Sequence, residues 1–143
     1  MANIKAKNCI SGTHGYVWWD GELIAEIVSF EATLKPETES VTFAGDMWED
    51  RKLMGLKGEY KMKIKKVYSR AAALAEAFKK GLDPRAEFVS KLDDPDALGH
   101  ERIALHNCWF DDLTLQTFES KKITEEEYSG GYTGFDYLDK ISA

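Results

Sequence analysis

The stretch from Leu56 to Lys65 restricts the fold of this chain more than any other part of the sequence. Its apolar residues, Tyr60, Met62 and Ile64, alternate with the charged residues Lys57, Glu59, Lys61, Lys63 and Lys65. A period of two is typical of a β-strand that buries one face and exposes the other to water. The alternation therefore predicts a sheet with one face in a core and one charged face.

One helix is predicted, over residues 70–80. Ser69 is its expected N-cap, and Gly81 suits the left-handed position after a helix. We expect one apolar stripe of this helix to cover a sheet. The stripe is formed by Ala71, Leu74, Ala75 and Phe78.

Most of the remaining chain has strand patterns. Asp20-Gly21 is a turn pair that closes tight hairpins, and it lies between the expected strands 16–19 and 22–35. Pro36 has no N–H for a ladder and is expected to end the second strand. Gly130-Gly131 is expected to connect the strand over 122–128 to the last strand. Further strands are predicted over 85–92, 101–108, 109–118, 122–128 and 135–141. The patterns thus predict a mainly β fold with one α-helix.

Residues 37–55 fit neither the helical nor the strand period, although 41–43 has the character of a short strand. Long irregular segments in compact domains are usually functional or disordered. This one contains residue types that are enriched where chains bury surface against each other. We predict an extended inter-subunit loop that is mobile in the free subunit and ordered on a neighbour. The candidate contact residues are Met47, Trp48, Leu53 and Met54.

Composition excludes several classes of function. The 143 residues suit a single domain, 1–143, which begins with an N-terminal arm over residues 1–15. A net charge of −6 does not favour condensation on nucleic acid or on an anionic membrane. There is no apolar run of membrane-spanning length and no leader pattern, so no membrane anchor is expected. Cys9 and Cys108 form no CxxC pair and are expected to be reduced, although the sequence leaves a disulfide open.

The sequence contains no recognisable catalytic or metal-binding constellation. The histidines, His14, His100 and His106, have no ligand spacing. The carboxylates Asp93, Asp94 and Asp96 would suit calcium chemically, but the register and closing glutamate of an EF-hand are missing. We expect them to initiate a turn around Pro95. No nucleophile elbow or glycine-rich phosphate loop is present. The expected protein is not an enzyme, and it has no catalytic residue, cofactor or metal.

Motifs spread over nearly the whole chain resemble those of a known family. They are Asn8–Gly15, Trp19-Asp20-Gly21, Met54–Gly58, Tyr68-Ser69-Arg70, Ser90–Asp96, Phe110–Leu115 and Phe135–Leu138. In these residues the chain is similar to the tail tube proteins of contractile-tailed phages and phage-like bacteriocin particles, of the PBSX (XkdM-like) family. The resemblance implies a tail-tube fold, a β-sandwich or half-barrel of two sheets with one flanking α-helix. It also implies a structural virion protein of a prophage or phage, without an active site.

The resemblance also implies an assembly. Copies would form hexameric rings that stack into the inner tail tube, a conduit for DNA and a puncturing tube. Expected partners are further copies of itself and the sheath, tape-measure and baseplate proteins, with non-specific passage of DNA. The implied location is the tail of a virion or phage-like particle assembled in the bacterial cytoplasm. Residues 37–55 would be the family's extended loop.

Other interpretations remain open at this point. The same tube could belong to a DNA-free bacteriocin or secretion machine. A monomeric ligand-binding β-barrel with tryptophans at its mouth is a third possibility. The lysine-rich strand is the difficult feature of a DNA conduit, because cations bind the duplex by counterion release. Either this strand faces away from the lumen, or acidic neighbours such as Glu125, Glu126 and Glu127 offset its charge.

Overall fold

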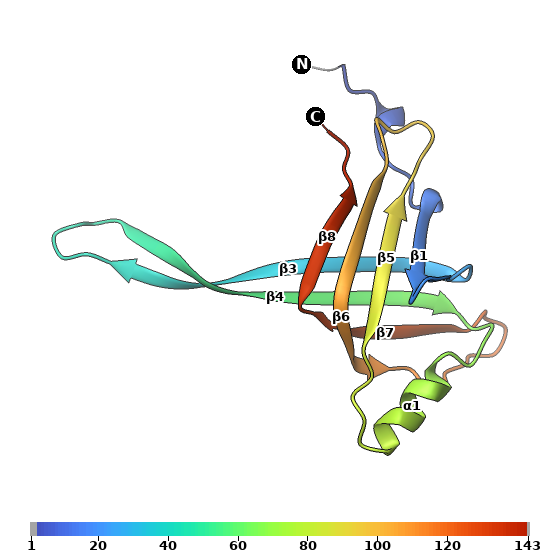
Figure 1. The fold of residues 1–143 in the computed structure, drawn as a ribbon. Helices are drawn as coiled ribbons and strands as arrows, with labels where there is room; N and C mark the ends of the chain where they lie inside the picture. Colours follow the sequence, from blue (N-terminus) through green and yellow to red (C-terminus); the bar gives the residue numbers. More distant parts are fainter. Residues whose placement is uncertain (1–2, 143) are drawn as a thin grey trace.

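The computed structural model describes residues 3–142, which form two antiparallel layers, a short helix and a projecting arm of two strands (Figure 1). Met1, Ala2 and Ala143 lie outside the described residues, and so does the start of the expected N-terminal arm. The elements within this range are η1 (Ala6–Asn8), η2 (Gly12–His14), β1 (Gly15–Trp19), β2 (Glu22–Leu23), β3 (Ile27–Thr42), β4 (Glu49–Lys65), α1 (Ala71–Lys79), β5 (Ala86–Leu92), β6 (Glu101–Leu113), β7 (Glu125–Tyr132) and β8 (Gly134–Asp139).

The two layers share strand β6. Its first half pairs with β5 and β8, and its second half pairs with β7, which continues the sheet to β4 and β3. Between the halves lies Asn107, with a φ of 54° and a side-chain amide that donates to Thr133 Oγ1 at 3.0 Å. Figure 1 shows β1, β5, β6 and β8 crossing the direction of β3, β4 and β7. The expected mainly β fold is confirmed, but its strands form one continuous antiparallel sheet that folds into two layers at β6 instead of two separate sheets.

The core lies between the two layers. Tyr60, Met62 and Ile64 are buried in it, as their alternation predicts. The ring of Phe88, from the other layer, lies 5.0 Å from the ring of Tyr60. The Tyr60 hydroxyl donates to the carbonyl oxygen of Trp109 at 2.8 Å, so the polar end of this buried ring is satisfied.

The Asp20-Gly21 turn closes the β1–β2 hairpin, as predicted. Trp19 pairs with Glu22, and the two turn residues have positive φ angles of 49° and 85°. Asp20 also connects the hairpin to β5: its backbone N–H donates to the Glu87 carbonyl oxygen, and its carboxylate accepts from the Glu87 N–H. The turn therefore fixes the end of β1 against the sheet.

Three predicted strand boundaries were wrong. The strand expected over 22–35 is divided into β2 and β3 because the chain changes layer between them. The strands expected over 101–108 and 109–118 form one strand, β6, which ends at Leu113. Pro36 does not end a strand but pairs with Leu56 inside β3. Among the described residues, β3 has a strand partner on one side only, and an edge strand tolerates the missing N–H of proline.

Gly130 and Gly131 lie inside β7 and not in the expected connection between two strands. Here β7 passes so close to β6 that a Cβ on Gly130 would lie 1.8 Å from the carbonyl oxygen of Trp109. A Cβ on Gly131 would lie 2.3 Å from the indole ring of Trp109. Close approach between strands therefore requires these glycines, and the sequence pattern alone does not distinguish this requirement from a turn.

Helix α1 agrees with the predicted range but differs in two details. Gly81 has the expected positive φ, 79°. The first difference is the N-cap, which is Arg70 instead of Ser69. The second is the extent of the apolar stripe. Ala71 is buried and Leu74 packs against the core, as the stripe predicts. Phe78 does not belong to the core, because 39% of its surface is exposed at the C-terminal end of the short helix. Only the stripe residues in the first turns of the helix therefore pack against the core.

Candidate assembly surfaces

Residues 36–56 form a two-stranded arm that projects from the layers (Figure 1). The prediction of an irregular loop over 37–55 was wrong, because β3 and β4 stay paired as far as Thr42 and Glu49. Since neither strand of the arm buries a face, the ladder has no alternation that a sequence pattern would reveal. We call residues 43–50 the tip.

The tip is a defined turn. Gly45 adopts a φ of 84°, and the Asp46 N–H donates to the Phe43 carbonyl oxygen at 3.2 Å. The Asp46 carboxylate in turn accepts from the Trp48 N–H at 3.0 Å, as aspartate side chains commonly do in turns. The order of the arm in the single chain thus comes from its own backbone pairing and this turn.

The structure places all four sequence-predicted contact residues on the surface of the arm. The exposed fractions of Met47, Trp48, Leu53 and Met54 are 101%, 82%, 58% and 61%. Phe43 and Leu56 are similarly exposed, and the sequence analysis did not single them out. A hairpin interpretation of 27–65 would have found both, since they lie at the turn and at the base of one ladder.

The charged face of β4 forms a lattice of opposite charges with its neighbours. Glu59 Oε2 lies 2.8 Å from Lys35 Nζ, and the Lys35 hydrogen bond is the largest cause of the lowered pKa of Glu59. Glu127 Oε1 lies 2.9 Å from Lys61 Nζ, which lowers the pKa of Glu127 and raises that of Lys61. Cross-strand pairs of opposite charge are favourable. Lys61 of β4 is therefore offset by Glu127 of β7, in line with one of the two alternatives that the sequence left open.

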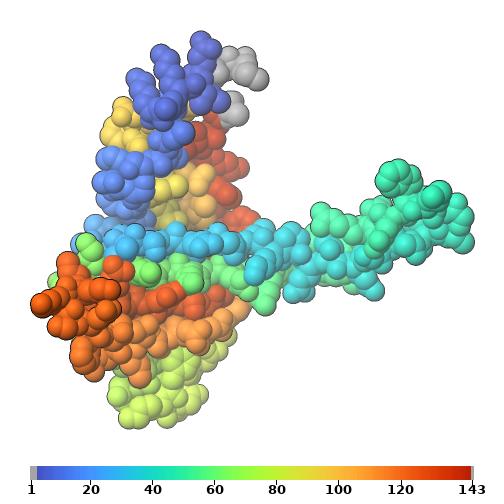
Figure 2. Space-filling model, turned by 180° about the vertical axis from the view of Figure 1, so that it is seen from behind, coloured from blue at the N-terminus to red at the C-terminus, as the bar shows by residue number. Residues whose placement is uncertain are grey.

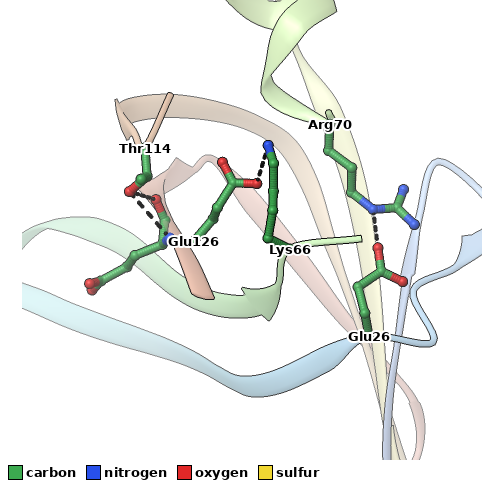
Figure 3. Close-up of polar contacts among 6 residues, drawn as sticks. Glu26, Lys66, Arg70, Thr114 and Glu126 are labelled. Atoms are coloured by element: carbon green, nitrogen blue, oxygen red, sulfur yellow. Dashed lines mark hydrogen bonds and ion pairs between the residues drawn. The ribbon is translucent and has the colours of Figure 1, made fainter. Parts of the chain in front are cut away.

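Two ion pairs fix the chain between β4 and α1, at the end of the sheet opposite the arm (Figure 3). Lys66 Nζ lies 2.9 Å from Oε1 of the buried Glu126, and Arg70 pairs with Glu26. Burial has the largest single effect on the pKa of Glu26 and raises it, but the hydrogen bond from Arg70, a backbone hydrogen bond and the positive charge of Arg70 together lower that pKa below its usual value. We call residues 66–70 and 114–124 the far end.

The acidic loop 93–96 is a turn, as expected. Asp94 accepts hydrogen bonds from the backbone N–H groups of Asp96, at 2.9 Å, and of Ser11, at 2.8 Å. The bond from Ser11 is the largest cause of the lowered pKa of Asp94. Asp94 thereby holds the N-terminal segment against the loop between β5 and β6.

The titratable groups that the sequence singled out are dispersed. His106 contacts Asp136 at 2.8 Å, and His100 contacts Asp139 at 3.4 Å, whereas His14 is remote from both in the chain and lies next to β1. Among residues 3–142, no group of three or more His, Cys, Asp or Glu side chains is arranged to hold a metal ion. Within the same range, the chain has no helix with the length and apolar character that crossing a membrane requires.

The two cysteines are free thiols. Cys9 is exposed and Cys108 is buried. Burial raises the pKa of the Cys108 thiol to about 12, so this group is protonated near neutral pH. Cys108 therefore acts as a small apolar side chain in the core, as expected for a reduced cysteine.

The exposed arm and the two-layer β body agree with the comparison to known families. The model of the phage tail tube protein family matches residues 2–139. The chain belongs to the phage tail tube protein family. It is 32% identical over 142 residues to the phage-like element PBSX protein XkdM of Bacillus subtilis (strain 168), and the alignment covers 97% of each chain.

Solved structures of contractile systems share the fold. The sheath/tube terminator of an extracellular contractile injection system matches with a TM-score of 0.73 and 11% identity, over 94% of this chain and 100% of that one. The tube terminating cap of the anti-feeding prophage also matches with a TM-score of 0.73, at 10% identity and over 97% of both chains. The family and the fold point to a structural, non-enzymatic role in a phage or phage-like tail.

Proposed function

We propose that this tail tube protein assembles with copies of itself into hexameric rings that stack into the inner tube of a contractile tail. The observation that carries the proposal is the arm. A two-stranded hairpin is marginal in water when it buries no face, yet this one displays six large apolar side chains. They are Phe43, Met47, Trp48, Leu53, Met54 and Leu56, all exposed in the single chain. Such a patch marks a surface that another chain covers.

The edges of the two layers support closure into a ring. In the described part of the chain, β3 and β8 each have a strand partner on one side only. Unpaired strand edges template association with further strands, and closure of a sheet around an axis removes them. Pairing of edges between neighbouring copies would close a ring, and the arm would connect that ring to others.

The charge lattice on β4 suits a conduit for a polyanion. A wall that neutralises phosphates would hold DNA by counterion release, whereas a wall of mutually paired charges offers little net attraction. Lys35, Lys61, Glu59 and Glu127 are paired within the subunit in this way. We therefore propose passage of DNA without binding, in a tail assembled in the host cytoplasm and surrounded by sheath, tape-measure and baseplate proteins.

Electron microscopy of the concentrated protein tests the assembly. Wild-type protein should form six-fold rings or tubes, and Trp48→Ala should lose them while its melting temperature stays within a degree or two of wild type. Thr38→Ala, on the same arm but without a large apolar side chain, is the matched control and should assemble. Absence of rings and tubes at every wild-type concentration, and in the parent particle, would overturn the proposal.

A DNA-free bacteriocin or secretion tube requires the same subunit contacts. The nucleic acid content of the purified particle separates the two assignments. Nuclease-resistant DNA in the particle supports the phage conduit, and its absence from intact, contractile particles supports the DNA-free machine.

A further inference from the structure

An apolar groove lies at the base of the arm, where the arm leaves the two layers. It has a volume of about 420 Å³. Tyr132 forms its floor by packing across Gly58, where a Cβ would lie 2.5 Å from the ring, and its hydroxyl donates to the Thr33 carbonyl oxygen at 2.8 Å. Its walls are formed by Leu34, Leu56, Trp109 and Phe135. The groove is thus a built surface on a fixed floor.

The charge of the groove is cationic. Lys57 is the one charged residue among those that line it. Lys57 Nζ is 3.5 Å from Glu59, whose carboxylate is held more closely by Lys35 at 2.8 Å, so Lys57 is available to another anion. The Arg85 guanidinium lies 5.3 Å from the centre of the Trp109 ring, but it already pairs with Asp83 at 2.7 Å, so Lys57 is the cation that the groove offers.

The tip of the arm has the complementary composition. Its apolar residues, Phe43, Met47 and Trp48, are exposed, and its charged residues are all acidic. These acidic residues are Asp46, Glu49 and Asp50. We propose that the tip of one copy docks in the arm-base groove of a second copy, with Trp48 or Met47 in the apolar hollow and an acidic neighbour on Lys57. This proposal rests on the proposed tube and names the surface that receives the arm.

Other hollows of the subunit fit the tip less well. The hollow between β3 and the layer of β1, β5 and β6 is apolar, but Glu101 is one of its lining residues and would repel an acidic tip. The hollow at the far end measures about 150 Å³, and its two charged residues, Lys66 and Glu126, already pair with each other. Apolar walls together with an available cation distinguish the groove at the base of the arm.

The groove cannot be filled by the tip of the same chain. The paired strands of the arm hold Trp48 roughly 25 Å from Leu56, at about 3.3 Å per residue. Figure 2 shows the arm extending away from the body as a straight projection. Each copy therefore offers a tip at one point and a groove at another, which is a heterologous contact. Contacts of this type propagate from copy to copy into an open series, as a tube requires.

Cysteine cross-linking tests the contact directly. In a Cys9→Ser background, one chain carries Met47→Cys and a second carries Leu56→Cys. Mixed assemblies oxidised under mild conditions should give a disulfide-linked dimer on a non-reducing gel. A chain that carries both changes should give a ladder of multimers, because its two thiols cannot meet within one copy.

The matched control pairs Met47→Cys with Ile123→Cys, which places the second thiol at the exposed far end. If position 47 forms a disulfide with position 123 and not with position 56 in assembled tubes, the tip does not dock in the groove, although the proposed tube still forms. Failure of wild-type protein and particles to show rings would overturn the tube, and the groove with it.

A charge swap provides a second measurement. Lys57→Glu and Asp50→Lys should each raise the protein concentration needed for tube formation about tenfold, as for loss of a close interfacial charge pair. The double variant should recover most of that loss, whereas Lys57→Glu combined with Lys52→Glu, at an arm position outside the tip, should not. Equal assembly of all variants would contradict the proposal.

Discussion

Strands β3 and β4 are continuous from the body to the arm, yet their two halves differ in what holds them. Between Gly58 and Ile64, alternate residues of β4 are buried against the other layer. Between Glu49 and Met54 every residue is exposed. The same backbone ladder therefore has a core on one side of the groove and none on the other.

Because of this difference, we expect substitutions in the body to change the stability of the subunit and substitutions in the arm to change its assembly. Apolar burial is the dominant favourable term in folding, so changes in the body act on the free energy of unfolding. Side chains of the arm contribute little to that free energy because they bury little apolar surface when the chain folds. The apolar ones form the exposed surface that another copy would cover in the proposed tube. The predictions below test this separation, from the largest expected effect to the smallest.

The largest effect is expected in the core. Phe88→Ala should lower the free energy of unfolding by about 3–5 kcal/mol, because a fully buried ring at the centre of the aromatic cluster is replaced by a cavity. Denaturant unfolding followed by near-UV circular dichroism measures this. A loss below about 1 kcal/mol would mean that the layers are held together elsewhere.

The helix should give an intermediate effect. Phe78→Ala should lower the free energy of unfolding by about 1 kcal/mol, since this ring is partly exposed and lies outside the core. Leu74→Ala is the comparison variant and should cost more, because Leu74 packs against the core. The two are measured by the same denaturant titration, and the reverse order would place Phe78 in the core.

Shortening the arm should have a still smaller effect on the subunit. Replacement of residues 40–51 by an Asn-Gly turn joins Glu39 to Lys52, which are opposite each other in the ladder. The free energy of unfolding should change by less than about 0.5 kcal/mol, while tube formation is abolished. Differential scanning calorimetry and electron microscopy of the same sample measure both. A large loss of stability would show that the arm is part of the folded core.

The smallest effect is expected from pH. The hydrogen bond to Asp136 raises the pKa of His106 above its unfolded value, with a further contribution from Glu87. Such a pair stabilises the fold fully below the unfolded pKa, about 6.5, and the contribution is lost as the pH rises through the folded pKa. The destabilisation caused by Asp136→Asn should therefore be largest below about pH 6.5 and shrink as the pH rises through the raised pKa of His106. Denaturant midpoints at each pH measure it, and a constant difference would contradict the assignment.

The sequence by itself determined the features that follow from local pattern. The alternation around Tyr60 specified the buried face of β4, because a period of two has one geometric meaning. Asp20-Gly21 specified a hairpin and Gly81 a helix end, since both require positive φ. Residue type alone also marked Met47 and Trp48 as exposed apolar side chains of an unusual segment.

Tertiary structure decided what depends on neighbours distant in the chain. Gly130 is needed because β6 approaches β7, a contact that no local pattern contains. Pro36 is tolerated within β3 because of the place of that strand at an edge. The arm is a ladder although neither face is buried, because cross-strand hydrogen bonds satisfy backbone groups whatever the side chains are. The groove at its base exists only where Leu34, Trp109 and Phe135 meet from three separate strands, so folding alone brought it together.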